Sequence, residues 1–176
     1  DLRCEFPGRR IGGLEVDARN LPLLTEAFFR ADCIVNAAST VDHTENIARA
    51  LLDSGRDYLD TQLSLPPKLE VLERYADRLA GAGVCCITDG GFHPGLPAVL
   101  VRYASRRFHQ LREARVYTAM NLNWKALHFS EATRRELADE FRYFRPLEFR
   151  RGRWRSRSWL RPLFFRFDPP FGRRYC

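Results

Sequence analysis

The first 110 residues alternate short apolar runs with longer stretches in which apolar residues recur at helical spacing. This alternation is typical of strand–helix–strand units that build a parallel sheet. Because a helix-length stretch separates successive apolar runs, the runs require crossover connections and are expected to pair as parallel neighbours. The predicted strands are Ile11–Val16, Cys33–Ala38, Tyr58–Thr61 and Val84–Thr88, of which the second and fourth are expected to be buried.

The stretches between these runs carry start and stop signals for helices. Asn20 is a suitable N-cap for a helix that continues to Phe28, and Gly55 is a stop signal for a helix over Thr44–Asp53. Further helices are predicted after Pro66 and Pro67, ending at Gly81 and Gly83, and over Ala98–Arg107. Residues 1–110 therefore predict an α/β fold with a doubly wound parallel sheet.

Beyond residue 112 the pattern changes. Ala114–Met120 predicts a strand of a different sheet, and Ser130–Phe141 predicts a charged helix capped by Ser130. The segments near 146–156 and 160–168 are predicted to form strands in which Trp154 or Trp159 is partly buried. We therefore expect residues 111–176 to begin a second, α+β domain, with the boundary near residues 108–113.

With 176 residues and 45% apolar content, the chain can bury one core and part of a second. The sequence contains no apolar run of the roughly 20 residues that a membrane span requires. The start, from Asp1 to Glu5, does not resemble a signal peptide, and Met120 is the only methionine, so an excerpt or a processed product is expected. The five cysteines form no CxxC pair and no metal-ligand spacing, which favours a reducing, cytoplasmic setting without structural disulfides and without a metal site.

The net charge of +7 is unevenly distributed. Residues 142–176 contain eleven arginines against Glu148 and Asp168, so this segment carries +9 and the remainder −2. Aromatic residues are interleaved with these arginines, and such a segment could bind nucleic acid by pairing with phosphates and stacking on bases. Nucleic-acid binding by this segment is therefore an alternative function. We favour solvent-facing strands, because apolar and charged residues partly alternate between Phe149 and Phe167.

Residues suited to ligand binding follow three of the predicted strands. In a doubly wound sheet, ligands bind just beyond the carboxyl ends of the strands. Ala37 and Ala38 are small enough for a dinucleotide backbone to approach, and Asn36 offers both donor and acceptor groups. The alternative is that the small residues only let the next helix pack closely. The candidate cofactor-binding residues are Asn36, Ala37, Ala38, Asp60, Thr61, Gly90 and Gly91.

The loop after the last predicted strand contains the candidate substrate-binding residues His93, Pro94 and Gly95. His93 could transfer protons near neutral pH or act as a plain hydrogen-bonding group. Asp17 could cap the next helix or face an adenine, and Asp1 could hold a ribose hydroxyl. The remaining histidines, expected to be structural or at the surface, are His43, His109 and His128.

The order and spacing of three segments resemble the saccharopine dehydrogenase-like oxidoreductases. These segments are Val35–Ala38, Tyr58–Thr61 and Asp89–Pro97, and comparable residues lie on strands four, five and six of that family's Rossmann domain. Gly152–Trp154 and Phe167–Arg174 resemble segments of the family's second domain. The resemblance thus covers nearly the whole chain, and the Pro-Gly loop after a buried strand is its most specific element.

The resemblance implies a partial Rossmann domain followed by the start of an α+β substrate and dimerisation domain. It also implies hydride transfer between NADP or NAD and a small-molecule amine, imine or carbonyl substrate. A homodimer formed through the second domain would fit the family, whereas a membrane partner is not expected. Some family members carry Asp where this chain has His93, so the resemblance does not fix a role for this residue.

One departure from the family pattern limits the expected activity. The sequence contains no GxGxxG, because neither Gly12-Gly13 nor Gly90-Gly91 fits that spacing. In this fold the glycine loop brings backbone amides and a helix N-terminus to the pyrophosphate. We therefore expect weak activity from this chain, and a non-catalytic interaction domain is the other alternative.

Overall fold

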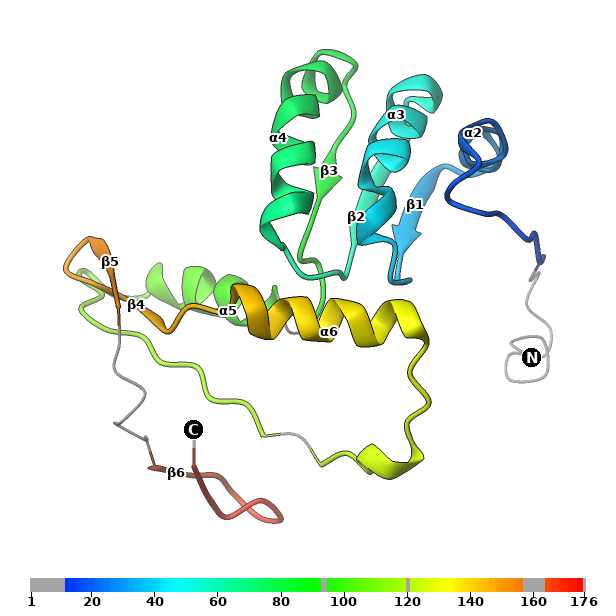
Figure 1. Ribbon diagram of the computed structural model, residues 1–176. Helices are drawn as coiled ribbons and strands as arrows, with labels where there is room; N and C mark the ends of the chain where they lie inside the picture. Colours follow the sequence, from blue (N-terminus) through cyan, green and yellow to red (C-terminus); the bar gives the residue numbers. More distant parts are fainter. Residues whose placement is uncertain (1–11, 93–94, 120, 157–163, 176) are drawn as a thin grey trace. The chain divides into compact units, whose positions relative to one another are not determined.

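The computed structural model describes residues 12–92, 95–119, 121–156 and 164–175 (Figure 1). Its described residues fall into two compact units. The first unit takes its residues from Asp1–Asp60 and Pro67–Thr88, and the second from Thr61–Pro66 and Asp89–Cys176. The domain boundary predicted near residues 108–113 stays a prediction.

A three-stranded parallel sheet forms the centre of the first unit. Its strands β1 (Cys33–Asn36), β2 (Asp57–Asp60) and β3 (Cys86–Ile87) lie in the order β1-β2-β3 (Figure 1). In the register, Asn36 lies opposite Asp60 and Tyr58 lies opposite Cys86. The prediction that these strands are parallel neighbours, with their carboxyl ends on one side, is confirmed.

The helices of this unit begin and end at the predicted signals. The Asn20 side chain accepts a hydrogen bond from the backbone nitrogen of Leu23, so it caps the first helix. Gly55 follows the next helix at a φ of 64°, a left-handed conformation that favours glycine. The helical elements are α2 (Leu21–Phe29), the 3-10 helix η1 (Val41–His43), α3 (Thr44–Ser54) and α4 (Pro66–Gly81).

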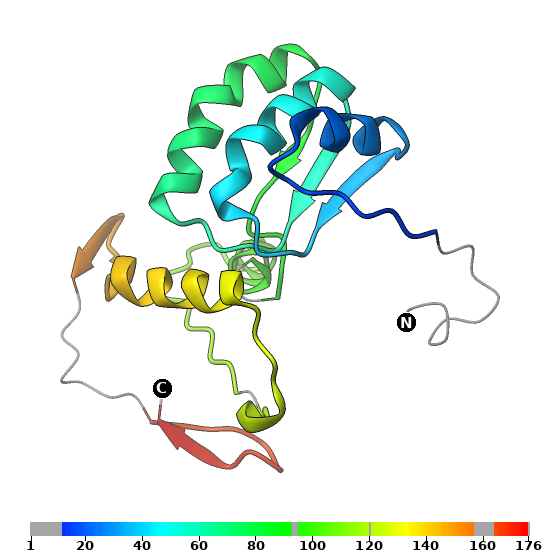
Figure 2. The same cartoon turned by 45° about the vertical axis from the view of Figure 1, so that its right-hand side comes forward.

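The helices α3 and α4 cover the same face of the sheet (Figure 2). Both crossovers advance in one direction along the strand order, and right-handed connections then place both helices on one side. The buried core joins α2, α3 and α4 to β2. Its members are Leu24, Phe28, Ile47, Ala48, Ala50, Leu51, Tyr58, Tyr75, Leu79 and Val84.

The opposite face of the sheet is open in the described residues. Val35 is 65% exposed and Ile87 is 48% exposed, whereas Tyr58 on the covered face is buried. The expectation that Cys33–Ala38 and Val84–Thr88 form buried strands is therefore wrong for the residues that point to the open face, such as Val35 and Ile87. The reason is that successive side chains of a strand point to opposite faces, and the described helices of this unit cover only one of them.

The predicted strand over Ile11–Val16 does not form in its described part. Gly12–Val16 has no regular secondary structure, and Ile11 lies outside the described residues. A strand needs a neighbouring strand for its backbone hydrogen bonds, and no described strand pairs with this segment. An apolar run alone therefore did not suffice to predict a strand here.

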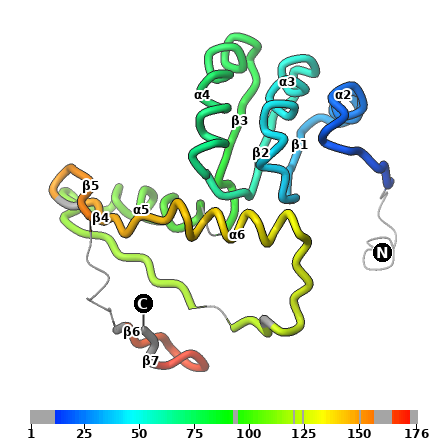
Figure 3. The backbone as a smooth tube through the Cα atoms, viewed as in Figure 1, coloured from blue at the N-terminus to red at the C-terminus, as the bar shows by residue number. Residues whose placement is uncertain are grey.

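The described residues of the second unit form the helices α5 (Leu96–Ser105) and α6 (Glu131–Tyr143), together with strands that pair as hairpins (Figure 3). Ser130 caps α6, because its hydroxyl accepts a hydrogen bond of 3.1 Å from the backbone nitrogen of Thr133. The strands pair antiparallel as β4–β5 and β6–β7. The elements are α5 (Leu96–Ser105), the 3-10 helix η2 (Trp124–Ala126), α6 (Glu131–Tyr143), β4 (Leu147–Arg150), β5 (Arg153–Ser156), β6 (Phe164–Arg166) and β7 (Arg173–Tyr175).

One prediction for this unit needs correction, and the prediction that Trp154 or Trp159 is partly buried is tested only at Trp154. Ala114–Ala119 is not a strand, because it has no pairing partner among the described residues, and Met120 lies outside them. Strands do form within 146–156 and at Phe164–Arg166, as predicted. Trp154, however, is 67% exposed, because the β4–β5 hairpin has no described layer over its aromatic side; Trp159 lies outside the described residues.

Within the described part of the chain, no helix is both long and apolar enough to cross a membrane.

Candidate functional site

Three polar residues form a row across the carboxyl ends of the parallel strands. Asn36 ends β1 and lies opposite Asp60, which ends β2. Thr88 follows β3, and its hydroxyl lies 3.2 and 3.3 Å from the two carboxylate oxygens of Asp60. All three lie on the helix-covered face, where their neighbours are protein groups.

Both the nitrogen and the oxygen of the Asn36 side-chain amide form hydrogen bonds within the protein. Its Nδ2 donates to the Thr40 hydroxyl at 2.8 Å and to the Tyr58 hydroxyl at 2.9 Å. Its Oδ1 accepts from the backbone nitrogen of Ala38 at 3.2 Å. Burial raises the pKa of Tyr58, and Asp60 raises it further, so Tyr58 stays a neutral partner of the amide. Asn36 therefore orients the turn that leaves β1.

Asp60 forms a buried ion pair with Lys68. The Lys68 Nζ lies 2.8 Å from the Asp60 Oδ1, and both side chains are only 1% exposed. Lys68 comes from the first turn of α4, so the pair ties the end of β2 to that helix. With Thr88 donating to the same carboxylate, Asp60 holds three elements together, and its carboxylate is occupied by protein groups.

The residues that lie exposed at this edge are small. Ala37 and Ala38 follow Asn36 directly, and both are exposed. The candidate Thr61 belongs to the second unit, where its side chain is exposed. The predicted cofactor-binding residues of the first unit thus divide into two kinds. Asn36 and Asp60 form hydrogen bonds with other protein groups, whereas Ala37 and Ala38 are exposed and accessible to a ligand.

A loop of the second unit follows β3, and we call its described residues, Asp89–Phe92 and Gly95, the Asp89 loop. The backbone nitrogen of Leu96 donates to the Gly91 oxygen at 3.0 Å, which closes the base of the loop. Gly95 has a φ of 120°, and a Cβ atom there would lie 1.9 Å from the Asp89 oxygen. Only glycine fits this position. The candidate residues His93 and Pro94 lie outside the described residues.

Asp89 itself has two unusual features. Its φ is 57°, a left-handed conformation that few residues other than glycine adopt. One carboxylate oxygen, Oδ2, accepts a hydrogen bond of 2.5 Å from the Ser64 hydroxyl. The other, Oδ1, is buried and has no hydrogen-bond partner in the described part of the chain. The sequence placed Asp89 at the end of a strand but carried no signal for this environment.

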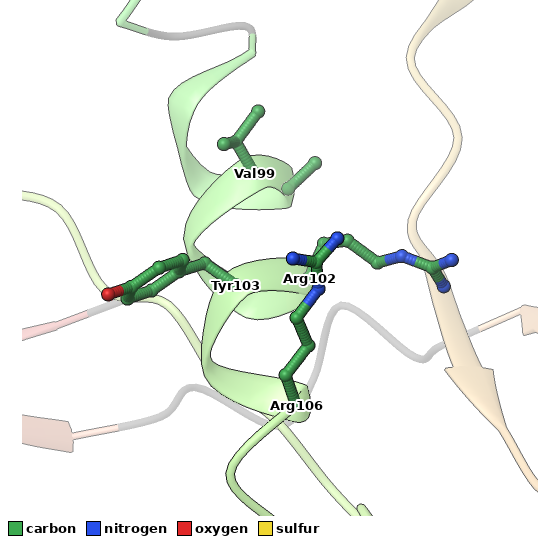
Figure 4. A pocket seen from close by; sticks show the side chains of 5 residues that line it. Val99, Arg102, Tyr103 and Arg106 are labelled. Carbon is green, nitrogen blue, oxygen red and sulfur yellow. The ribbon is translucent and has the colours of Figure 1, made fainter.

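An open hollow of about 430 Å³ lies along α5. Figure 4 shows Arg102 and Tyr103 extending from opposite sides of this helix. Its lining residues belong to α5 or, in the case of Arg106, follow it directly, so no second element brings polar groups to the hollow, which makes it a poor candidate for catalysis. The lining residues are Ala98, Val99, Arg102, Tyr103 and Arg106.

Asp17 does not cap α2, contrary to one expectation for it. Its carboxylate binds the backbone nitrogen and the guanidinium of Arg19, while Asn20 provides the cap. The hydrogen bond from the Arg19 side chain lowers the pKa of Asp17 to about 2. Asp1, the other acidic candidate, lies outside the described residues.

The remaining histidines contribute no described metal site. His43 is half-buried in η1, and His109 and His128 are exposed. Among the described residues, no three His, Cys, Asp or Glu side chains gather closely enough to hold a metal ion.

The chain matches no protein-family model, and no curated protein is significantly similar to it. The functional assignment therefore depends on the geometry of the site and on the motifs in the sequence.

Proposed function

We propose that the protein is an NAD(P)-dependent oxidoreductase of the saccharopine dehydrogenase-like type. In this proposal the parallel sheet belongs to a Rossmann-type domain, and a hydride passes between the nicotinamide and an amine, imine or carbonyl substrate. A cytoplasmic location and a homodimer formed through the second unit belong to the same proposal. The order of the motifs around Asn36, Asp60 and Asp89 supports it.

The observation that carries the proposal is the exposed Ala37–Ala38 turn at the carboxyl end of β1. Ligands of open parallel sheets bind beyond this edge. The turn lacks bulky side chains, and the bond from Ala38 to Asn36 holds its backbone in one conformation. A flat dinucleotide can therefore approach the backbone closely, and little ordering of the protein is needed when it binds.

The hydrogen bonds and the ion pair next to the Ala37–Ala38 turn also favour cofactor binding at this edge. Asn36, Tyr58 and Thr40 form a hydrogen-bonded group beneath the turn. The buried Asp60–Lys68 pair holds the neighbouring strand end. Such supports keep a binding edge rigid, which is what a site that positions a nicotinamide for hydride transfer requires.

The test is a titration of the isotope-labelled chain with NADH and NADPH, followed by protein NMR. We expect saturable shifts of the Ala37 and Ala38 amide signals and of the Asn36 side-chain amide. Binding should be weak, because the sequence has no glycine loop for the pyrophosphate. Adding an upstream strand, GxGxxG loop and helix should tighten it.

The matched variants are Ala37→Leu and Ala82→Leu. Both replace an exposed alanine, but Ala82 lies in the turn between α4 and β3, away from the carboxyl edge. Ala37→Leu places a branched side chain where the dinucleotide should lie. It should weaken binding roughly tenfold or more, about 1.4 kcal/mol, whereas Ala82→Leu should not. Equal binding by the two variants, or no shift at the edge with either nucleotide, contradicts the assignment.

A further inference from the structure

The carboxylate of Asp89 has a protein partner on one side only. Ser64 donates to its Oδ2, and this bond between neutral hydroxyl and carboxylate is its only hydrogen bond among the described residues. No arginine, lysine or histidine of the described chain forms an ion pair with it. Buried polar atoms in native proteins are nearly always hydrogen-bonded, so an exception such as Oδ1 requires a physical reason.

The backbone holds this carboxylate in place against its own conformational preference. Asp89 adopts a φ of 57°, at which an aspartate is less stable than a glycine. The close approach of Gly95 to the Asp89 oxygen and the bond from Leu96 to Gly91 keep the loop closed. Strained residues that the surrounding structure fixes in this way cluster at binding sites.

We propose that Asp89 is the binding residue for an ammonium group of the substrate, which donates an N–H to Oδ1. A carboxylate oxygen that is withdrawn from water and lacks a cationic partner is best matched by a charged donor. The identification of this ammonium with the substrate's protonated amine rests on the proposed oxidoreductase function. In this conformation Oδ1 is withdrawn from solvent and has no hydrogen-bond partner among the described residues, which is the environment that the proposal uses.

Simple probes of the whole labelled chain test this chemistry. Titration with n-butylammonium chloride should shift the amide signals of Gly90 and Gly91 saturably. Tetramethylammonium chloride at the same ionic strength has the charge but no N–H, and it should leave these signals in place. The neutral hydroxyl probe n-butanol should shift them at least tenfold less at equal concentration. Equal shifts with n-butanol, or with tetramethylammonium, overturn the assignment to an ammonium.

Substitutions separate a binding role from a structural one. Asp89→Asn keeps the shape of the side chain and tolerates the left-handed backbone, but it removes the charge. It should weaken the n-butylammonium response at least tenfold. The control Asp77→Asn removes an exposed carboxylate on α4 and should respond like the parent. Ser64→Ala leaves the Asp89 carboxylate in place and should bind n-butylammonium at least as tightly as the parent.

The stability of a fourth variant, Asp89→Gly, separates the two roles further. Asp89→Gly removes the backbone strain and the unpaired oxygen together, so its melting temperature should equal or exceed that of the parent while its n-butylammonium response is lost. A lower melting temperature together with an unchanged response in Asp89→Asn assigns Asp89 to the structure and overturns the proposal. The nicotinamide titration is read at Ala37 and Ala38, so each proposal can fail without the other.

Discussion

The amide of Asn36 is held by Thr40, Tyr58 and the backbone nitrogen of Ala38. A side chain that satisfies its hydrogen bonds within the protein has little left to offer a ligand. Its effect on a ligand is therefore indirect, through the conformation of the turn that it supports. Asp60 acts in the same indirect way, because Lys68 and Thr88 occupy its carboxylate.

The Asp60–Lys68 pair allows a sharp prediction about stability. Lys68→Met leaves an uncompensated carboxylate in the interior and should lower the free energy of unfolding by about 3–5 kcal/mol. The double variant Lys68→Met with Asp60→Asn should recover most of that loss, because the neutral amide can still accept from Thr88. Urea unfolding followed by circular dichroism measures both.

The control for this prediction is Arg74→Met. It breaks the exposed pair between Arg74 and Glu45, in which both side chains are about half exposed. Exposed ion pairs contribute about 0–1 kcal/mol, so this variant should unfold close to the parent. If Lys68→Met also unfolds within about 1 kcal/mol of the parent, the buried pair does not hold the strand ends together.

At the scale of single elements, most helix ends lie where the sequence indicates, although α5, predicted over Ala98–Arg107, spans Leu96–Ser105. Asn20 and Ser130 cap α2 and α6 through their side chains, and prolines start α4. These capping interactions join residues that are three or four positions apart in the chain, so they do not depend on tertiary contacts. Strands lack such local signals, because a strand exists only with a partner. This is why the strand predicted over Ala114–Met120 does not form in its described part, Ala114–Ala119.

The end of α3 provides a test of one such signal. Gly55 and Gly81 both have open space where a Cβ would lie, but only Gly55 has a positive φ. Gly55→Ala should therefore lower the free energy of unfolding by about 1–2 kcal/mol through backbone strain alone. Gly81→Ala lies in the last turn of α4 and should raise it by up to about 1 kcal/mol. Equal effects in thermal unfolding contradict the assignment of a left-handed cap at Gly55.

At the scale of the whole molecule, the arginine-rich segment 142–176 concentrates the positive charge. The register of the β4–β5 hairpin pairs Phe149 with Trp154, whose rings are 5.2 Å apart in an edge-to-face contact. Arg155 pairs with Glu148 at the adjacent position, so it lies on the opposite face of the hairpin. In the β4–β5 hairpin the two stacked rings and Arg155 therefore lie on opposite faces, which weighs against this hairpin as a surface that binds single-stranded nucleic acid.

This separation predicts weak binding that depends on charge alone. A labelled thymidine oligonucleotide should bind the chain more weakly than micromolar at an ionic strength of about 0.15 M, and addition of salt should weaken it further. Trp154→Ala should leave the residual affinity unchanged. Fluorescence anisotropy with parent and variant measures both. A tenfold loss in Trp154→Ala would show base stacking, which contributes about 1–3 kcal/mol per base, and would favour the nucleic-acid function instead.

The sequence by itself determined the local features of this protein. The helix starts at Asn20 and Ser130, the stop at Gly55 and the parallel strands ending at Asn36 and Asp60 all followed from short-range chemistry and from the length of the crossovers. These features depend on neighbours in the chain or on connection length, and both can be read from the sequence.

Only the tertiary structure decided which face of the sheet is covered and which polar side chains have partners. Periodicity cannot show that Asn36 and Asp60 face inward towards Tyr58 and Lys68, since these partners are brought together by folding. It also cannot show that Asp89 keeps a buried oxygen without a partner. Such facts depend on register and on contacts distant in sequence, because the free energy of a buried polar group is set by what surrounds it in space.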